Sequence, residues 1–79
     1  METRIKDLRT DRELTQLEVA QAIGISQRKY SYLETGNQQW TDELLARLAD
    51  FYQTSVDYLL KRTNEPRPYP RTRRKEPKP

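Results

Sequence analysis

The chain has 79 residues, of which 33% are hydrophobic and 34% are charged, and it contains neither cysteine nor histidine. A chain of this length is expected to form one compact domain, since small chains bury too little surface to build two ordinary cores. Without cysteine or histidine, thiolate chemistry, imidazole catalysis and the usual zinc ligand sets are excluded, so we expect no enzyme, no cofactor and no metal site. No apolar run approaches the roughly 20 residues of a membrane span, so we expect a soluble, cytoplasmic protein that does not bind membranes.

Net charge divides the chain at residue 63. Residues 1–63 carry nine Lys or Arg against ten Asp or Glu, whereas residues 64–79 carry six against two. All five prolines lie in the second segment, which has almost nothing apolar beside Tyr69 and so cannot offset its ordering entropy by burial. We therefore expect a folded domain over residues 1–63 and a disordered or polyproline II-like basic tail over residues 64–79.

Helix-start signals recur at close intervals and predict five short helices. The first helix is expected to begin after a cap at Thr3 and to end near Asp11, with Ile5 and Leu8 facing the core. The alternation of apolar and polar residues that marks a strand is absent from the sequence. The fold class is therefore expected to be all-α.

Three of the helices are expected to begin in the same way, with a hydroxyl side chain as the N-cap and a hydrophobic staple around it. Thr15 precedes Glu18 by three residues, which is the spacing of a capping box, and it starts the second helix at or just before Leu17. Ser26 and Thr41 occupy the same position before the third and fourth helices. The staple pairs around these caps are Leu14 with Val19, Ile25 with Tyr30, and Trp40 with Leu45.

The chain has only two glycines, Gly24 and Gly36, and each follows the apolar pattern of a predicted helix. Because glycine adopts the left-handed conformation without strain, each is expected to end the helix before it. Between Ile23 and Ser26 this leaves the short, glycine-containing turn that joins two helices at a steep angle, which is a helix-turn-helix. The small side chain of Ala20 would let the two helices approach closely.

The last helix and the core complete the predicted fold. Ser55 is expected to cap a short fifth helix through Leu60, and the aromatic residues Tyr30, Trp40 and Phe51 are assigned to the core or to staples. The other side chains expected to face inward are Val19, Ala20, Ile23, Ile25, Leu33, Leu44, Leu45, Leu48, Ala49, Tyr52, Val56, Leu59 and Leu60.

Two stretches carry a family pattern: TQLEVAQAIGISQRKYSYLETG over residues 15–36 and LLARLADFYQTSVDYLL over residues 44–60. Together they resemble the helix-turn-helix domains of phage repressors and Cro proteins, also called the xenobiotic response element (Xre) family. The resemblance implies a five-helix, lambda-repressor-like domain that binds double-stranded DNA, as a homodimer on an inverted repeat, and represses transcription. The motif residues are Gln16, Ala20 and Gly24, the pair Glu34 and Gly36, and the Leu-Ala-x-x-Tyr run from Leu48.

The third helix, residues 26–35, is the helix that the resemblance implies reads bases. If Tyr30 and Leu33 pack inward, the helical period turns the polar side chains outward on a common face. Glutamine can pair with adenine and arginine with guanine, and hydroxyl groups can bond bases or phosphates, so this face suits the major groove. The expected contacts are Gln27, Arg28 and Tyr32 with bases, together with Lys29 and Ser31.

Two further DNA contacts are expected outside this face. Gln16, at the start of the second helix, matches a position where the resemblance implies a phosphate contact that also braces Gln27, and helix N-termini favour phosphate. Asn37 lies in the loop after the recognition helix. Similar proteins often carry Lys or Arg in this loop, so here the chain departs from the family pattern.

Arg9 and Glu34 have the spacing of an ion pair in the same family, where it ties the first helix to the end of the recognition helix. A free carboxylate on a DNA-facing surface would repel phosphate, whereas a planar guanidinium can neutralise it through two hydrogen bonds. We therefore expect a structural role for this pair.

Other interpretations fit some of the same residues. Gln27, Arg28 and Lys29 also suit a solvated helix face, and the near-neutral domain also suits an antitoxin-like or adaptor module with a protein partner. The basic tail fits a solubilising end or linker, a DNA-contacting arm, or a Pro-x-x-Pro ligand. Its cationic run is Arg71, Arg73, Arg74 and Lys75.

Overall fold

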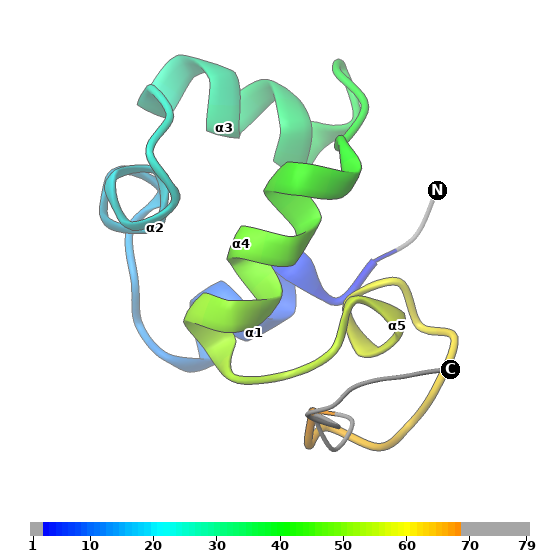
Figure 1. The fold of residues 1–79 in the computed structure, drawn as a ribbon. Coiled ribbons are helices and arrows are strands. Elements are labelled where there is room, and N and C mark those ends of the chain that lie inside the picture. Colours follow the sequence, from blue (N-terminus) through cyan, green and yellow to red (C-terminus); the bar gives the residue numbers. More distant parts are fainter. Residues whose placement is uncertain (1–2, 69–79) are drawn as a thin grey trace, which may run out of the picture.

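The structure, a computed structural model, describes residues 3–68, and these residues form an all-α domain as expected (Figure 1). The helices are α1 (Ile5–Asp11), α2 (Gln16–Ile23), α3 (Gln27–Thr35), α4 (Asp42–Tyr52) and α5 (Val56–Leu59). α2 packs against α3 and α4, and α4 packs against α5. In Figure 1, α4 passes through the centre of the molecule, with α3 at one end and α5 towards the other. None of these helices is long and apolar enough to cross a membrane.

Side-chain caps begin four of the five helices, as the sequence predicts. At α2 the Thr15 hydroxyl accepts from the backbone N–H of Glu18 at 3.1 Å, and the Glu18 carboxylate accepts from the N–H of Thr15 at 2.8 Å. This reciprocal pair is the expected capping box. The hydroxyls of Ser26, Thr41 and Ser55 each accept from the N–H three residues later. These caps fix where α2 to α5 begin.

The start of α1 differs by one residue from the prediction. Arg4, not Thr3, is the N-cap residue, and the Thr3 hydroxyl accepts instead from the N–H of Ile5 at 3.2 Å. The backbone N–H of Arg4 donates to the carbonyl of Leu59 at 2.8 Å, so a tertiary contact sets the helix start. The other small difference is that α5 ends at Leu59, with Leu60 as its C-cap.

The core contains the expected apolar side chains, with one exception. Apart from Phe51 on α4, all of the inward positions predicted on α2, α3 and α4 are buried, and Ile25, Val56 and Leu60 pack against the core while partly exposed. Phe51 was expected inside and is 37% exposed, because the buried stripe of α4 passes through Tyr52 and leaves Phe51 on its flank. The Phe51 ring covers the edge of Tyr52, with ring centroids 4.9 Å apart.

Residues 61–68, which we call the C-terminal strap, return across the domain after α5. The guanidinium of Arg4 donates from Nε to the carbonyl of Tyr58 at 2.9 Å. Its Nη2 donates to the carbonyl of Thr63 and to Oδ1 of Asn64, both at 3.0 Å. The same guanidinium lies 4.3 Å from the centre of the Tyr58 ring. One arginine therefore holds the start of α1, α5 and the strap together.

Some residues after residue 63, where the sequence analysis placed the end of the domain, contact the helices. The hydroxyl of Thr54 donates to the carbonyl of Pro66, so residues that the sequence analysis placed in the tail contact the helices. The prediction considered only apolar burial, whereas polar bonds to backbone carbonyls hold this segment. Residues 69–79, which contain the expected cationic run from Arg71 to Lys75, lie outside the described residues.

Candidate DNA interface

The turn between α2 and α3 has the geometry of a helix-turn-helix. Gly24 lies in the left-handed region with φ 81°, and the N–H of Ile25 donates to the carbonyl of Ala20 at 3.0 Å. Ala20 is fully buried where the two helices meet. From α4, Nη1 of Arg47 donates to the carbonyl of Ile23 at 3.1 Å and so satisfies an end of α2 that has no other side-chain cap. The turn is thus fixed by both local and tertiary bonds.

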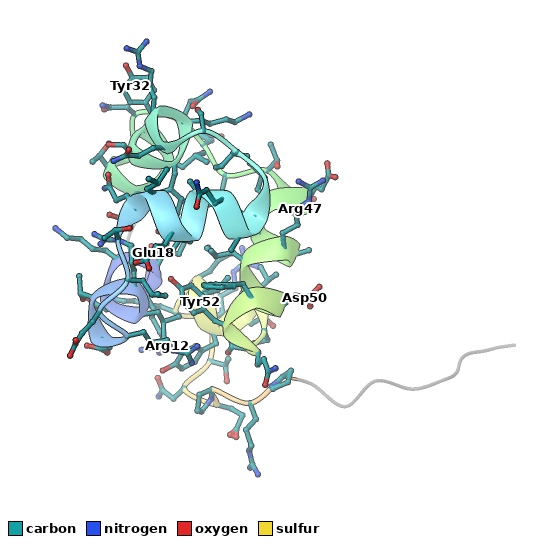
Figure 2. All side chains as sticks on the ribbon, turned by 90° about the vertical axis from the view of Figure 1, so that its left-hand side faces the viewer. Arg12, Glu18, Tyr32, Arg47, Asp50 and Tyr52 are labelled. Atoms are coloured by element: carbon teal, nitrogen blue, oxygen red, sulfur yellow. The ribbon has the colours of Figure 1, made fainter. Side chains whose placement is uncertain are left out.

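The outward face of α3 presents the side chains that the sequence analysis assigned to it. Tyr30 and Leu33 are buried, and Gln27, Arg28 and Lys29 are exposed. Tyr32 is 44% exposed and projects from the tip of the molecule in Figure 2. Ser31 is only half-buried, and its backbone carbonyl accepts from the hydroxyl of Thr35 at 2.9 Å. A polar and cationic surface therefore lies on the second helix of the motif.

The loop after α3 adds polar groups but no cation. Gly36 ends the helix in the left-handed region with φ 90°, as expected. The N–H of Gln38 donates back to the carbonyl of Tyr32 at 3.1 Å, which closes the loop onto the helix. Asn37, Gln38 and Gln39 are all exposed.

Gln16 lies at the start of α2, as expected, but its side chain bonds a residue other than Gln27. It is the first residue of α2 and is half-buried, and its Nε2 donates to Oε1 of Glu34 at 3.1 Å. Among the described residues, the side-chain amide of Gln16 therefore donates its hydrogen bond to Glu34 and not to Gln27. The bracing of Gln27 was expected only from the family resemblance, and the Glu34 carboxylate is a stronger acceptor than the Gln27 amide.

Glu34 accepts hydrogen bonds from three other residues. Arg9 donates from Nε to Oε2 at 2.9 Å and from Nη2 to Oε1 at 3.0 Å, which is the bidentate pair expected from the sequence. The hydroxyl of Tyr30 donates to Oε2 at 2.7 Å, and the amide of Gln16 donates to Oε1. The Glu34 side chain is 3% exposed and that of Arg9 is 13% exposed. Each carboxylate oxygen thus accepts two bonds inside the protein.

The surroundings of Glu34 decide its protonation. Burial by itself would raise the pKa of the Glu34 carboxyl, but the hydrogen bonds from Arg9, Tyr30 and Gln16 outweigh burial and hold the pKa below its ordinary value. The hydrogen bond from Arg9 to Glu34 raises the pKa of Arg9. Burial, together with the separate bond from the Tyr30 hydroxyl to Glu34, raises the pKa of Tyr30. At neutral pH the site therefore holds a carboxylate, a guanidinium and a neutral phenol.

This lowered pKa predicts a specific loss of stability in acid. Because the pKa of Glu34 is lower in the folded chain than in the unfolded chain, its contribution is complete above the unfolded value of about 4.3 and disappears as pH falls through the folded value. Urea unfolding at several pH values measures it against Glu34→Gln, which cannot titrate. The difference in the free energy of unfolding between the wild type and Glu34→Gln should be constant above about pH 5 and should shrink below it. A gap independent of pH down to pH of about 2 would contradict the assignment.

Two buried tyrosines provide a matched pair for testing the hydroxyl bond. Tyr30 donates to Glu34, whereas the hydroxyl of Tyr52, also buried, has no hydrogen-bond partner among the described residues. Tyr30→Phe should lower the free energy of unfolding by about 1.5–3 kcal/mol, since it removes a bond to a charged group. Tyr52→Phe removes the same atom and should be neutral or stabilise by up to about 1 kcal/mol. Equal losses in urea unfolding would show that the Tyr30 bond contributes nothing.

The sequence analysis missed part of this network. The bonds from Tyr30 and Gln16 to Glu34, and the bond from Arg47 to Ile23, were not expected. The spacing of Tyr30 and Glu34 carries a signal, because residues four apart lie on the same helix face. The other two bonds join different helices and have no local signal.

The fold and this surface define a helix-turn-helix protein of the phage-repressor type, and the resemblance seen in the sequence is confirmed. A family model described as "Helix-turn-helix domain" matches residues 3–59, and the chain belongs to this family. The chain is 38% identical over 58 residues to the cryptic phage CTXphi transcriptional repressor RstR of Vibrio cholerae. It is also 35% identical over 65 residues to an uncharacterized HTH-type transcriptional regulator, YobD, of Bacillus subtilis strain 168.

The two relatives are longer than this chain. The matched segment covers 73% of the chain and 52% of RstR, and 82% of the chain and 58% of YobD. The chain thus spans a little over half the length of these relatives. No solved structure matches it significantly.

Proposed function

We propose that the chain binds double-stranded DNA by sequence and regulates transcription, acting as a repressor in the cytoplasm. The observation that carries the proposal is the outward face of α3, where exposed Gln27, Arg28 and Lys29 stand on a helix anchored by buried Tyr30 and Leu33. RstR, which is similar over more than half of the chain, is named a transcriptional repressor.

Each surface residue has a distinct proposed role. Gln27 and Arg28 read base edges in the major groove because their side chains can make paired hydrogen bonds to adenine and guanine. Tyr32 completes the base-reading face, and Ser31 beside it makes a polar contact. The residues proposed to hold the phosphate backbone are Lys29, Gln16 and Asn37.

We also propose that two copies bind together on an inverted repeat. Tyr58 in α5 is one candidate for the surface between the two copies, but the Arg4 guanidinium lies over its ring. Phe51 offers more exposed apolar surface, at a shallow groove that Leu8 and Pro66 also line. A two-fold pair would place the recognition helices about 34 Å apart, one turn of DNA.

Selection of bound sequences from a random duplex library tests both parts of this proposal. We expect the chain to enrich an inverted repeat whose half-sites are about 10–10.5 base pairs apart from centre to centre. Enrichment of a single half-site would argue against the paired arrangement. A pool that stays random while a protein partner binds tightly would favour the adaptor function instead.

We propose in addition that the basic tail contributes salt-sensitive affinity. The strap lies at the end of the domain away from α3 in both figures, and the 11 residues after Pro68 can span at most about 40 Å. Truncation after Pro68, which keeps the strap, should leave the melting temperature nearly unchanged. It should flatten the slope of log affinity against log salt by about 0.9 for each phosphate that the tail neutralises in the full chain.

Binding of the full and truncated chains to random duplex DNA at several salt concentrations measures this slope. Truncation after Thr63 serves as the comparison, because it also removes Asn64 and Pro66 and should lower the melting temperature. If the truncation after Pro68 leaves the salt slope unchanged, the phosphate contacts belong to the domain alone.

A further inference from the structure

A single buried carboxylate joins the helix that carries the proposed base readers to the start of the helix before it. Glu34 lies in the last turn of α3, and Gln16 is the first residue of α2. The distance from Nε2 of Gln16 to Oε1 of Glu34 is 3.1 Å, across 18 positions of sequence. Glu34 is therefore in direct contact with a residue proposed to hold a phosphate.

The bond restricts Gln16 before any DNA arrives. A glutamine side chain is among those that lose most rotamer freedom when they are fixed. Its amide has two N–H donors and one carbonyl acceptor, so one donor can bond Glu34 while the other donor remains for a second partner. Ordering a side chain in the free protein removes that cost from the binding step.

The chemistry of residue 34 suits this task because an ionised carboxylate only accepts hydrogen bonds. Arg9, Tyr30 and Gln16 all present donors to it. An amide at this position would turn its own donors towards some of these groups. The carboxylate is also 3% exposed and paired with Arg9, so its charge is shielded from a phosphate near Gln16.

We propose that Glu34 is a positioning residue for DNA binding, in which it holds the Gln16 amide in the orientation that meets a phosphate. The inference rests on the proposed function of Gln16 as a phosphate contact. It goes beyond the ion pair with Arg9, which by itself would only stabilise the fold. The stabilising role and the positioning role predict different results.

A double-mutant cycle on DNA affinity separates the two roles. Glu34→Gln should weaken binding to the selected DNA by about five- to tenfold when Gln16 is present, because the Gln16 side chain must then be ordered during binding. In a Gln16→Met background, Glu34→Gln should change affinity by less than about twofold, because the positioned group is already gone. Leu59→Val, a core change in α5 away from this network, is the control for reduced stability alone.

Equal losses from Glu34→Gln in both backgrounds would overturn the proposal and leave Glu34 a purely structural residue. A Gln16→Met variant that binds like the wild type would overturn it as well, although base reading by α3 would stand. If the wild-type chain binds no duplex DNA, the proposed function falls and this inference falls with it.

A measurement on the free wild-type chain keeps the proposal testable if Glu34→Gln does not fold. Nitrogen-15 relaxation of the side-chain amides should show Gln16 to be rigid and Gln21, an exposed glutamine on the same helix, to be mobile. If the two amides are equally mobile, Glu34 does not position Gln16, whatever the chain's affinity for DNA.

Discussion

Replacing Arg9 with methionine is expected to lower the free energy of unfolding by roughly 3–5 kcal/mol, because it leaves the buried Glu34 carboxylate without its guanidinium. The ion pair is nearly inaccessible to water, with side-chain exposures of 13% and 3%. For a domain of this size the melting temperature should fall by about 15 °C or more. Thermal and urea unfolding followed by circular dichroism measure the change.

Arg62→Met is the matched control for this prediction. Arg62 also pairs with a carboxylate, Asp57 at 3.8 Å, but the two side chains are 68% and 39% exposed. The same substitution there should cost less than about 1 kcal/mol. If the two variants lose similar stability, burial of the Arg9 pair is not what matters.

A second variant tests whether the stranded charge causes the loss. Arg9→Met combined with Glu34→Gln should be more stable than Arg9→Met alone, since the neutral amide can still accept from Tyr30 and needs no cation. If the double variant is no more stable than Arg9→Met, the buried unpaired charge is not the cause of the loss.

Replacing Gln27 or Arg28 with alanine is expected to weaken binding to the selected DNA site by roughly 1–3 kcal/mol each. Both side chains are exposed, so the stability of the domain should change little. Loss of a base contact should cost much less on random duplex DNA, which offers no matched base. Lys29→Ala should instead weaken binding to both DNAs alike, as expected for a phosphate contact.

Titrations against the selected site and a shuffled duplex at one salt concentration measure these losses. Gln21→Ala and Arg62→Ala are controls, since they remove exposed side chains of the same two types from α2 and from the strap. If Gln27→Ala and Arg28→Ala lower affinity equally on both duplexes, α3 does not read bases and the surface binds DNA only by charge.

Much of the local structure could be predicted because its determinants lie within a few residues of one another. The hydroxyls of Thr15, Ser26 and Thr41 cap N–H groups three residues away. Gly24 and Gly36 end helices because they adopt the left-handed conformation with little strain. The period of α3 likewise fixes which of its side chains are exposed and which are buried.

The candidate site was predictable to the extent that it depends on this period. The exposure of Gln27, Arg28, Lys29 and Tyr32 follows once Tyr30 and Leu33 are assigned to the core. Which of these side chains contacts DNA stays a prediction. The Arg9 and Glu34 pair was expected only through the family resemblance, since the two residues are 25 positions apart.

The sequence by itself determined the all-α class, the helix-turn-helix, the capped helix starts and the outward face of α3, because each depends on side chains acting within one or two helical turns. The tertiary structure decided which partners the long polar side chains select. Arg4 reaches the strap 60 positions away, and Gln16 donates to Glu34 rather than to Gln27. A glutamine or an arginine can reach many acceptors from its place in the sequence. Only the packing of the helices brings one buried carboxylate or free carbonyl within hydrogen-bond distance, and burial makes that partner the favoured one.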